Sequence, residues 1–398
     1  MRHRIPSTFG LATLFAGAAL IGCYGTPRTT GPDVDGSAGT GLAGAGGSSG
    51  TGGNAGAQSM DGGPDSSSCV DTTSDSKNCG ACGHDCLGGT CSGGACQAVL
   101  IARYLGNPVI IGVGADSVYL TTDIGYVGRA RKDGSDLKPF AMPGFASSAF
   151  IGTFVAEDRD RVFLSRFTGS TVQLSYCPTS GCDAEATAFG GPYSQYFAVD
   201  NSSHKIFWID YSPTQIWAAS TVGTVSGSTV PGAALTNGAS YSRLLYAQGG
   251  LYFADGNAVR KLPAAGGSLI TVTLSSSQIS VLGTNSSRLF VYDGSAIGYA
   301  PLPNGTGAMP APLIVTERAD SNVDGRFAAD DTAVYWIVNH ALVTCEIANC
   351  SATIQSLTSA TGEHVTDVGI DDHAIFWAEI AFDSATNTGA STVWRLAK

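Results

Sequence analysis

Residues 206–208 read Ile206-Phe207-Trp208, and this order of an aliphatic, an aromatic and a bulky apolar residue recurs along the chain. Seven copies are spaced by 38 to 45 residues: Val118-Tyr119-Leu120, Val162-Phe163-Leu164, Ile206-Phe207-Trp208, Leu251-Tyr252-Phe253, Leu289-Phe290-Val291, Val334-Tyr335-Trp336 and Ile375-Phe376-Trp377. An apolar run precedes each triplet, and a turn with Gly or Asp and then an alternating stretch follow it, so each unit holds four short strands. Four strands per unit at this period predict an all-β, seven-bladed β-propeller.

The two ends of the repeat region complement each other. The seventh unit starts near His364 and stops at Lys398 after its third strand, while residues 97–105 form a strand that belongs to no unit. We expect this N-terminal strand to be the fourth strand of the last blade, because an open ring would leave bare faces and strand edges. A six-bladed ring is the alternative fold.

The composition excludes several classes of protein. The chain has 398 residues, of which only 13% are charged, with 53 glycines and a net charge of −11. An average soluble chain has about 25% charged residues, and helical bundles and coiled coils usually have more. Binding to nucleic acid requires clustered Lys and Arg, so a nucleic-acid partner is not expected.

The N-terminus is typical of an export signal. Residues 1–22 combine a basic start with a 13-residue apolar stretch, 9–21, which is too short to span a bilayer. The stretch ends in Leu20-Ile21-Gly22-Cys23, which resembles the bacterial lipobox. The resemblance implies cleavage before Cys23 and lipidation of Cys23, which anchors the chain to a membrane. Because Tyr24 rather than Asp follows, we expect an outer-membrane location in the cell envelope. A plain signal peptide with a chance cysteine is the alternative.

Two further segments precede the propeller. Residues 23–68 are rich in Gly, Ser and Thr and predict a disordered tether behind the lipidated cysteine. Residues 69–96 hold six cysteines in a Gly-rich context: Cys69, Cys79, Cys82, Cys86, Cys91 and Cys96. Export favours three disulfides, in one of fifteen pairings among which the sequence does not choose, and a zinc site with His84 is the alternative.

Four more cysteines lie in the propeller region. They form two pairs with the same spacing, Cys177–Cys182 and Cys345–Cys350, and each pair brackets a turn-like stretch. The repeated spacing predicts two further disulfides, and free buried cysteines are the alternative.

Extended by one or two residues, several triplets read Phe207-Trp208-Ile209-Asp210 or Phe376-Trp377-Ala378-Glu379. This pattern resembles, in a degenerate form, the YWTD repeat of low-density-lipoprotein-receptor-type propellers, which usually have six blades. The resemblance covers residues 97–398 and implies that the fourth-position acids are structural, bonding backbone groups and groups of neighbouring blades, with a metal ring as the alternative. These acids are Asp210, Asp255, Asp293 and Glu379.

In propellers, the loops that join fourth to first strands and second to third strands lie on one face, which usually carries the ligand. Tyr and Arg, the usual hot-spot residues of binding surfaces, occur in these loops as Tyr193, Tyr196, Tyr211, Tyr241, Arg243, Arg318 and Arg326. We therefore expect a monomeric binding or scaffold module for a protein, peptide or glycan, with neither cofactor nor metal. A structural ion such as Ca²⁺ in the channel is a weaker idea.

An enzyme is the main alternative, because some propellers act as lyases, hydrolases or quinone-type dehydrogenases with an active site at the channel mouth. The candidate acid–base residues on the same face are His340, His364, Glu317 and Glu363. Their mutual geometry decides between the two hypotheses. The remaining propeller histidines, His204 and His373, are expected on the opposite face.

Overall fold

The computed structural model describes part of the chain from residue 71 onward. The described residues are 71–123, 126–140, 155–168, 171–181, 187–190, 194–211, 214–232, 235, 241–274, 278–293, 296–302, 307–308, 314–315, 327–358, 364–383 and 388–398. The chain divides into two compact units, 1–62 and 63–398, and every described residue belongs to the second. The expected signal peptide, the tether, Cys23 and Cys69 lie outside the described residues. None of the described helices is long and apolar enough to cross a membrane.

The repeat region forms seven antiparallel sheets, the blades, each built from four strands in the order inner to outer. Blade 1 consists of β4 (Pro108–Val113), β5 (Ser117–Thr122), β6 (Val127–Arg131) and β7 (Lys138–Pro139). Blade 2 consists of β8 (Val155–Asp158), β9 (Arg161–Thr168), β10 (Thr171–Pro178) and β11 (Thr187–Phe189). Blade 3 consists of β12 (Ser194–Asp200), β13 (Lys205–Tyr211), β14 (Thr214–Ser220) and β15 (Ser228–Thr229).

Blades 4 to 6 follow the same plan. Blade 4 consists of β16 (Tyr241–Ala247), β17 (Gly250–Asp255), β18 (Ala258–Pro263) and β19 (Ile270–Leu274). Blade 5 consists of β20 (Ser280–Thr284), β21 (Arg288–Tyr292), β22 (Ala296–Pro301) and β24 (Ile314–Val315). Blade 6 consists of β25 (Phe327–Ala329), β26 (Ala333–Val338), β27 (Ala341–Glu346) and β28 (Gln355–Ser356). Blade 4 gains a fifth strand, β23 (Gly307–Ala308), which runs parallel to β19.

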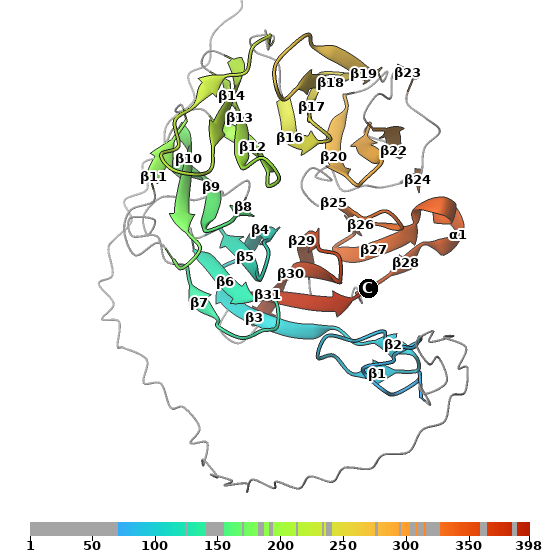
Figure 1. The fold of residues 1–398 in the computed structure, drawn as a ribbon. Coiled ribbons are helices and arrows are strands. Elements are labelled where there is room, and N and C mark those ends of the chain that lie inside the picture. Colours follow the sequence, from blue (N-terminus) through green and yellow to red (C-terminus); the bar gives the residue numbers. More distant parts are fainter. Residues whose placement is uncertain are drawn as a thin grey trace, which may run out of the picture. The chain divides into compact units, whose positions relative to one another are not determined.

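The N-terminal strand closes the ring, as the sequence predicts. Blade 7 consists of β29 (His364–Ile370), β30 (Ala374–Asp383) and β31 (Thr388–Ala397), and β3 (Val99–Leu105) pairs with β31 as its outer strand. Figure 1 shows β3 beside β31, with blade 1 next to it. Inner strands of successive blades are in contact, and β29 contacts β4, so blade 7 meets blade 1. The seven-bladed fold is confirmed, and the six-bladed alternative is wrong.

The apolar triplets explain why the blades form a ring. Each triplet lies on the second strand of a blade, where successive side chains point to opposite faces of the sheet. In blade 1, Val118 and Leu120 join a core cluster with blade 7, whereas Tyr119 joins the cluster with blade 2. The same alternation holds in blade 3, where Phe207 packs toward blade 4. Each triplet therefore contributes to both of its blade interfaces.

Seven core clusters result, one for each interface between neighbouring blades. The central aromatic side chains are almost fully buried; Phe163, Tyr252 and Phe376 are 0% exposed. Burying a large apolar side chain contributes roughly 1.5–3 kcal/mol. Seven such layers give a chain of low charge content a large core without helices.

The Cys-rich segment is held by disulfides. Cys79 pairs with Cys91 and Cys86 with Cys96, on either side of a short hairpin of β1 (Cys91–Ser92) and β2 (Ala95–Cys96). Cys82 is also disulfide-bonded, and its partner lies outside the described residues. Sulfur atoms in disulfides are not available as the thiolate ligands of zinc, so the disulfide interpretation is supported.

One buried arginine joins this segment to the propeller. Arg395 of β31 is 7% exposed and donates to the backbone carbonyl oxygens of Leu87 and Lys132. Leu87 also packs against the core cluster between blades 7 and 1. The Cys-rich segment thus contacts the propeller at the interface where the ring closes, which the sequence did not predict.

The two predicted C-x4-C pairs lie at the ends of third strands. Cys345 of β27 bonds to Cys350, which opens the short helix α1 (Cys350–Thr353) after the turn η1 (Ile347–Asn349). This disulfide closes a small helical excursion before β28 rather than a hairpin. Cys177 at the end of β10 is disulfide-bonded too, and Cys182 lies outside the described residues.

Candidate functional site

The two faces of the propeller differ in how the chain turns. We call the end of the blades where the inner strands begin the loop face; it also carries the turns between second and third strands. The other end, where the inner strands finish and turn into the second strands, is the turn face. His340 and His364 lie on the loop face, whereas His204 and His373 lie on the turn face.

β-Bulges mark the loop face. The inner strands of five blades shift register close to their first residues: β4, β12, β16, β20 and β29. Tyr196 and Arg243 occupy two of these bulges, and Arg243 has a φ of 35°. Bulges redirect side chains and are common beside binding sites. A left-handed backbone at a residue other than glycine costs energy, so the surroundings must hold Arg243 in place.

The structure places part of the predicted ligand surface. Tyr196 and Tyr211 are half-buried and pack against the same core cluster, between blades 3 and 4. Arg243 is half-buried, and Tyr241 begins β16. The other candidates lie outside the described residues: Tyr193, Glu317, Arg318, Arg326 and Glu363.

His340 and His364 come together, although 24 residues separate them in the sequence. Their ring centroids are 4.1 Å apart and the ring planes meet at 75°, an edge contact. The backbone N–H of Val365 donates to the carbonyl oxygen of His340 at 3.0 Å and fixes blade 7 against blade 6 at this point. His340 is exposed and His364 half-buried. Of the four proposed acid–base residues, these two are described, and they are in contact.

The turn face is built on a repeated side-chain cap. In four blades, an Asp or Asn at the end of the inner strand accepts hydrogen bonds from backbone N–H groups two and three residues later. These residues are Asp200, Asn285, Asp330 and Asp371. Such caps fix the tight turn into the second strand. These caps explain why an Asp ends the apolar run that precedes several of the triplets.

Side chains at the turn face also bridge all seven blade interfaces. Hydrogen bonds or ion pairs join Tyr119 to Glu157 (2.6 Å), His204 to Asp158 (3.0 Å), Tyr246 to Asp200, Gln248 to Ser286, Asn285 to Asp330 (2.8 Å), Lys398 to Asp330 (2.8 Å) and Lys132 to Asp371 (2.6 Å). Asp158 and Asp200 are the most enclosed of these acids, at 4% exposed each, and Asp158 also accepts from the hydroxyl of Thr221. Sequence analysis did not identify this ring of contacts.

A hollow of about 520 Å³ opens on the turn face between blades 7, 1, 2 and 3. Its wall is strongly charged and includes Lys132, Glu157, Asp158 and Asp371. Each of these four groups already takes part in a contact between blades. The charges of this hollow therefore stabilise the ring.

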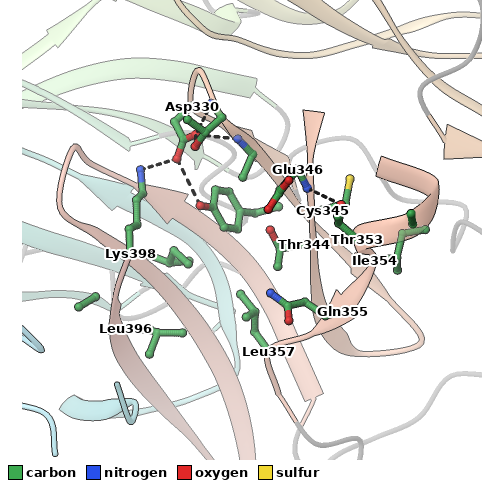
Figure 2. A pocket seen from close by; sticks show the side chains of 16 residues that line it. Asp330, Thr344, Cys345, Glu346, Thr353, Ile354, Gln355, Leu357, Leu396 and Lys398 are labelled. Carbon is green, nitrogen blue, oxygen red and sulfur yellow. Dashed lines mark hydrogen bonds and ion pairs between the residues drawn. The ribbon is translucent and has the colours of Figure 1, made fainter. Parts of the chain in front are cut away.

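A second hollow, of about 600 Å³, lies between blades 6 and 7. Figure 2 shows Lys398 reaching Asp330 at one end, with Leu357 and Leu396 further along the wall. Burial raises the pKa of Asp330, but hydrogen bonds from Lys398 and Thr332 outweigh burial and hold this pKa well below its usual range. The main charged pair of this groove thus fastens blade 6 to blade 7.

The fourth-position acids make local contacts. Asp255 accepts from Arg260 in its own blade (3.2 Å), Asp293 accepts from the N–H of Ala296 in its own turn, and Glu379 accepts from Trp377 at 2.7 Å. Asp210 is 5% exposed. Each of these three contacts lies within one blade.

Comparisons with known proteins agree on the fold. No protein-family model and no curated protein matches the sequence. A streptogramin B lyase is similar at 12% identity and a TM-score of 0.51, over 74% of this chain and 96% of that one. YCF48 bound to a peptide is similar at 11% identity and a TM-score of 0.52, over 76% of this chain and 96% of that one. The Swd1 β-propeller domain of Myceliophteria thermophila is similar at 12% identity and a TM-score of 0.55, over 75% of this chain and 99% of that one. At such identities the likeness shows the propeller fold alone.

Proposed function

We propose that the propeller is a binding module that recognises a protein, peptide or glycan on its loop face. The observation that carries this proposal is the set of β-bulges at the start of five inner strands, because bulges redirect side chains such as Tyr196, and Arg243 in one of them has a left-handed backbone. Tyr and Arg supply most of the binding energy in many interfaces.

The turn face supports the proposal by contrast. The charged side chains named above are engaged between blades there, and a ligand that recruited them would compete with ring stability. Propellers of this shape bind peptides in other proteins, as in the YCF48 structure, and we extend that kind of ligand to this chain.

The experiment is a screen of the purified chain against peptide and glycan arrays, repeated with one variant on each face. Arg243→Ala on the loop face should weaken the strongest signal at least about tenfold, as expected for a hot-spot arginine. Asp372→Ala, at an exposed position on the turn face, is the matched control and should leave the signal unchanged. Equal losses in both variants, or a loss only in Asp372→Ala, would overturn the placement of the ligand.

A second candidate function is a propeller enzyme with its active site on the loop face. It is favoured by the contact between His340 and His364, since one imidazole beside another can serve as acid and base. A streptogramin B lyase is among the similar folds, so a type B streptogramin is a suitable first substrate. Turnover that is lost in both His340→Ala and His364→Ala would favour the enzyme, and an intact substrate after prolonged incubation would favour the binding module.

We also propose that the chain is a lipoprotein, cleaved before Cys23 and anchored to the cell envelope through that residue, with residues 23–68 as a tether. The lipobox-like sequence supports this proposal. Labelled palmitate should be incorporated by the wild-type chain and not by Cys23→Ser. Labelling of the Cys23→Ser variant would contradict the proposed anchor.

The repeats are proposed to be degenerate relatives of YWTD repeats. The support is the sequence after the triplets, such as Phe207-Trp208-Ile209-Asp210. If the fourth-position acids have a structural role, Asp210→Ala should lower the stability of the whole propeller. An unchanged melting temperature would contradict that role.

A further inference from the structure

We propose that His340 and His364 form a binding site for a divalent transition-metal ion such as Zn²⁺, Ni²⁺ or Cu²⁺, at the junction of blades 6 and 7 on the loop face. This inference departs from the sequence-based expectation of no metal. It is independent of the proposed binding function, because the metal is measured directly.

The first support is the position of the two rings. A ring centroid lies about 1 Å behind the nitrogen that binds the ion, and each Zn–N bond measures about 2.0–2.1 Å, so two imidazoles on one tetrahedral zinc ion have centroids roughly 5 Å apart. The ring centroids of His340 and His364 are 4.1 Å apart. Rotation of the exposed His340 side chain would open this spacing and turn one nitrogen of each ring toward a shared ion. His340 is exposed, so solvent metal can reach the pair.

The second support is the backbone that carries His340. Val338 pairs with Ala341, which leaves Asn339 and His340 as a two-residue hairpin turn. Their φ angles are 49° and 66°, as in a type I′ turn. Glycine is the usual residue at the second position of such a turn, because it adopts this backbone without strain. The chain instead places an imidazole there, although an exposed ring gains little from packing.

The third support is rigidity between the two ligands. The hydrogen bond from the N–H of Val365 to the carbonyl oxygen of His340 joins the residue after His364 directly to the turn. β29 begins at His364, where His364 and Val365 already pair with β30, and pairing resumes at Asp367 after a bulge. Both ligands thus start from strands or turns with fixed backbones, which lowers the entropic cost of binding an ion.

Imidazole nitrogen defines the class of metal. It suits borderline ions such as Zn²⁺, Ni²⁺ and Cu²⁺ better than Ca²⁺ or Mg²⁺, which prefer oxygen. Two protein ligands leave the remaining coordination positions to water or to donor atoms of a bound molecule. A metal at this point would therefore present an open coordination site on the loop face.

The test is a calorimetric titration of the purified full-length chain with Ni²⁺, Zn²⁺ and Cu²⁺, without a histidine tag and with His3→Ala in every chain compared, because a free amino terminus followed by His3 binds Cu²⁺ and Ni²⁺ itself. We expect one tight equivalent in the wild type. His340→Ala and His364→Ala should each weaken binding at least about tenfold, since even loss of a partner outside the coordination sphere costs 10–100-fold. The electron paramagnetic resonance spectrum of the Cu²⁺ complex should show coupling to two ring nitrogens.

Two variants separate loss of the site from loss of the fold. His340→Gly relieves the left-handed backbone, so it should melt at the same or a higher temperature than the wild type and still lose metal binding. His373→Ala removes an exposed histidine on the turn face and should bind metal normally. Wild-type affinity in His340→Gly, an equal loss in His373→Ala, or the absence of a saturable equivalent in the wild type would each overturn the proposal.

Discussion

The two faces of this propeller use polar residues for opposite purposes. On the turn face, hydrogen bonds and ion pairs of side chains cross all seven blade interfaces, and an Asp or Asn caps the turn in four blades. On the loop face, inner strands begin with bulges, and His340 and Arg243 have left-handed backbones. The difference teaches that side-chain bonds across every blade interface stabilise the ring at the turn face, whereas irregular strand starts shape the loop face.

The largest expected effect concerns the ring itself, on which both faces depend. Deletion of residues 97–105 removes β3, whose Ile101 and Tyr104 are buried in the cluster between blades 7 and 1. We expect a loss of about 5 kcal/mol or more from these side chains and the strand ladder, comparable with the whole stability of many domains. Thermal unfolding followed by circular dichroism measures it.

A nine-residue deletion within the tether is the control for that experiment, and it should leave the melting temperature unchanged. If the chain without β3 has the same melting temperature as the wild type, ring closure by this strand contributes nothing to stability.

Removal of a bond between blades on the turn face should have the next largest effect. Asp158→Ala leaves His204 and the hydroxyl of Thr221 without their buried acceptor, and leaving a buried hydrogen-bonding group unsatisfied costs about 1–3 kcal/mol. Urea unfolding measures the loss. Asp372→Ala, at an exposed position on the same face, should change stability by less than about 0.5 kcal/mol. Similar values for the two variants would contradict a stabilising role of the turn face.

Carboxyl groups of the turn face should also make the stability of the propeller depend on pH. Burial raises the pKa of Asp200, but hydrogen bonds from Ser202 and Ser203 outweigh burial and lower this pKa from 3.8 to about 2. A carboxyl with a lowered folded-state pKa contributes stability that is complete above the unfolded pKa, and this contribution is lost as pH falls. We expect the loss between about pH 4 and pH 2.

Urea unfolding at several pH values in this range measures that dependence, with Asp200→Asn as the comparison. The variant cannot ionise at this position, so its stability should fall less steeply with acid. Parallel curves for the variant and the wild type would assign the acid sensitivity to other groups.

The same contrast shows how far the sequence could predict this molecule. Alternation along Val118-Tyr119-Leu120 and its six copies determines which side chain faces which neighbour, so the blade number and the closing strand followed from local pattern. The local pattern did not determine the disulfide partner of Cys79, because several cysteines of the Cys-rich segment are close enough to pair. Bonds between blades, such as Lys398 to Asp330, depend on how one blade is placed against the next. His340 and His364 could be named as loop residues, but not as neighbours.

The smallest expected effect tests whether the loop face accepts strain for recognition. Arg243 has a φ of 35°, and a left-handed backbone costs an ordinary residue roughly 1–2 kcal/mol, while glycine loses about 0.5–1 kcal/mol of chain entropy on folding. Relief of this backbone should therefore favour Arg243→Gly by about 0.5 kcal/mol, which offsets part of what is lost with the contacts of the half-buried Arg243 side chain, and the variant should weaken ligand binding. The matched control is Gln248→Gly, since Gln248 lies on the turn face and also has a left-handed backbone, with a φ of 46°. This variant loses the hydrogen bond from Gln248 to Ser286 in the next blade. It should leave ligand binding intact without a gain in stability, and a loss of ligand binding in both variants would mean that the two faces are not separate in function.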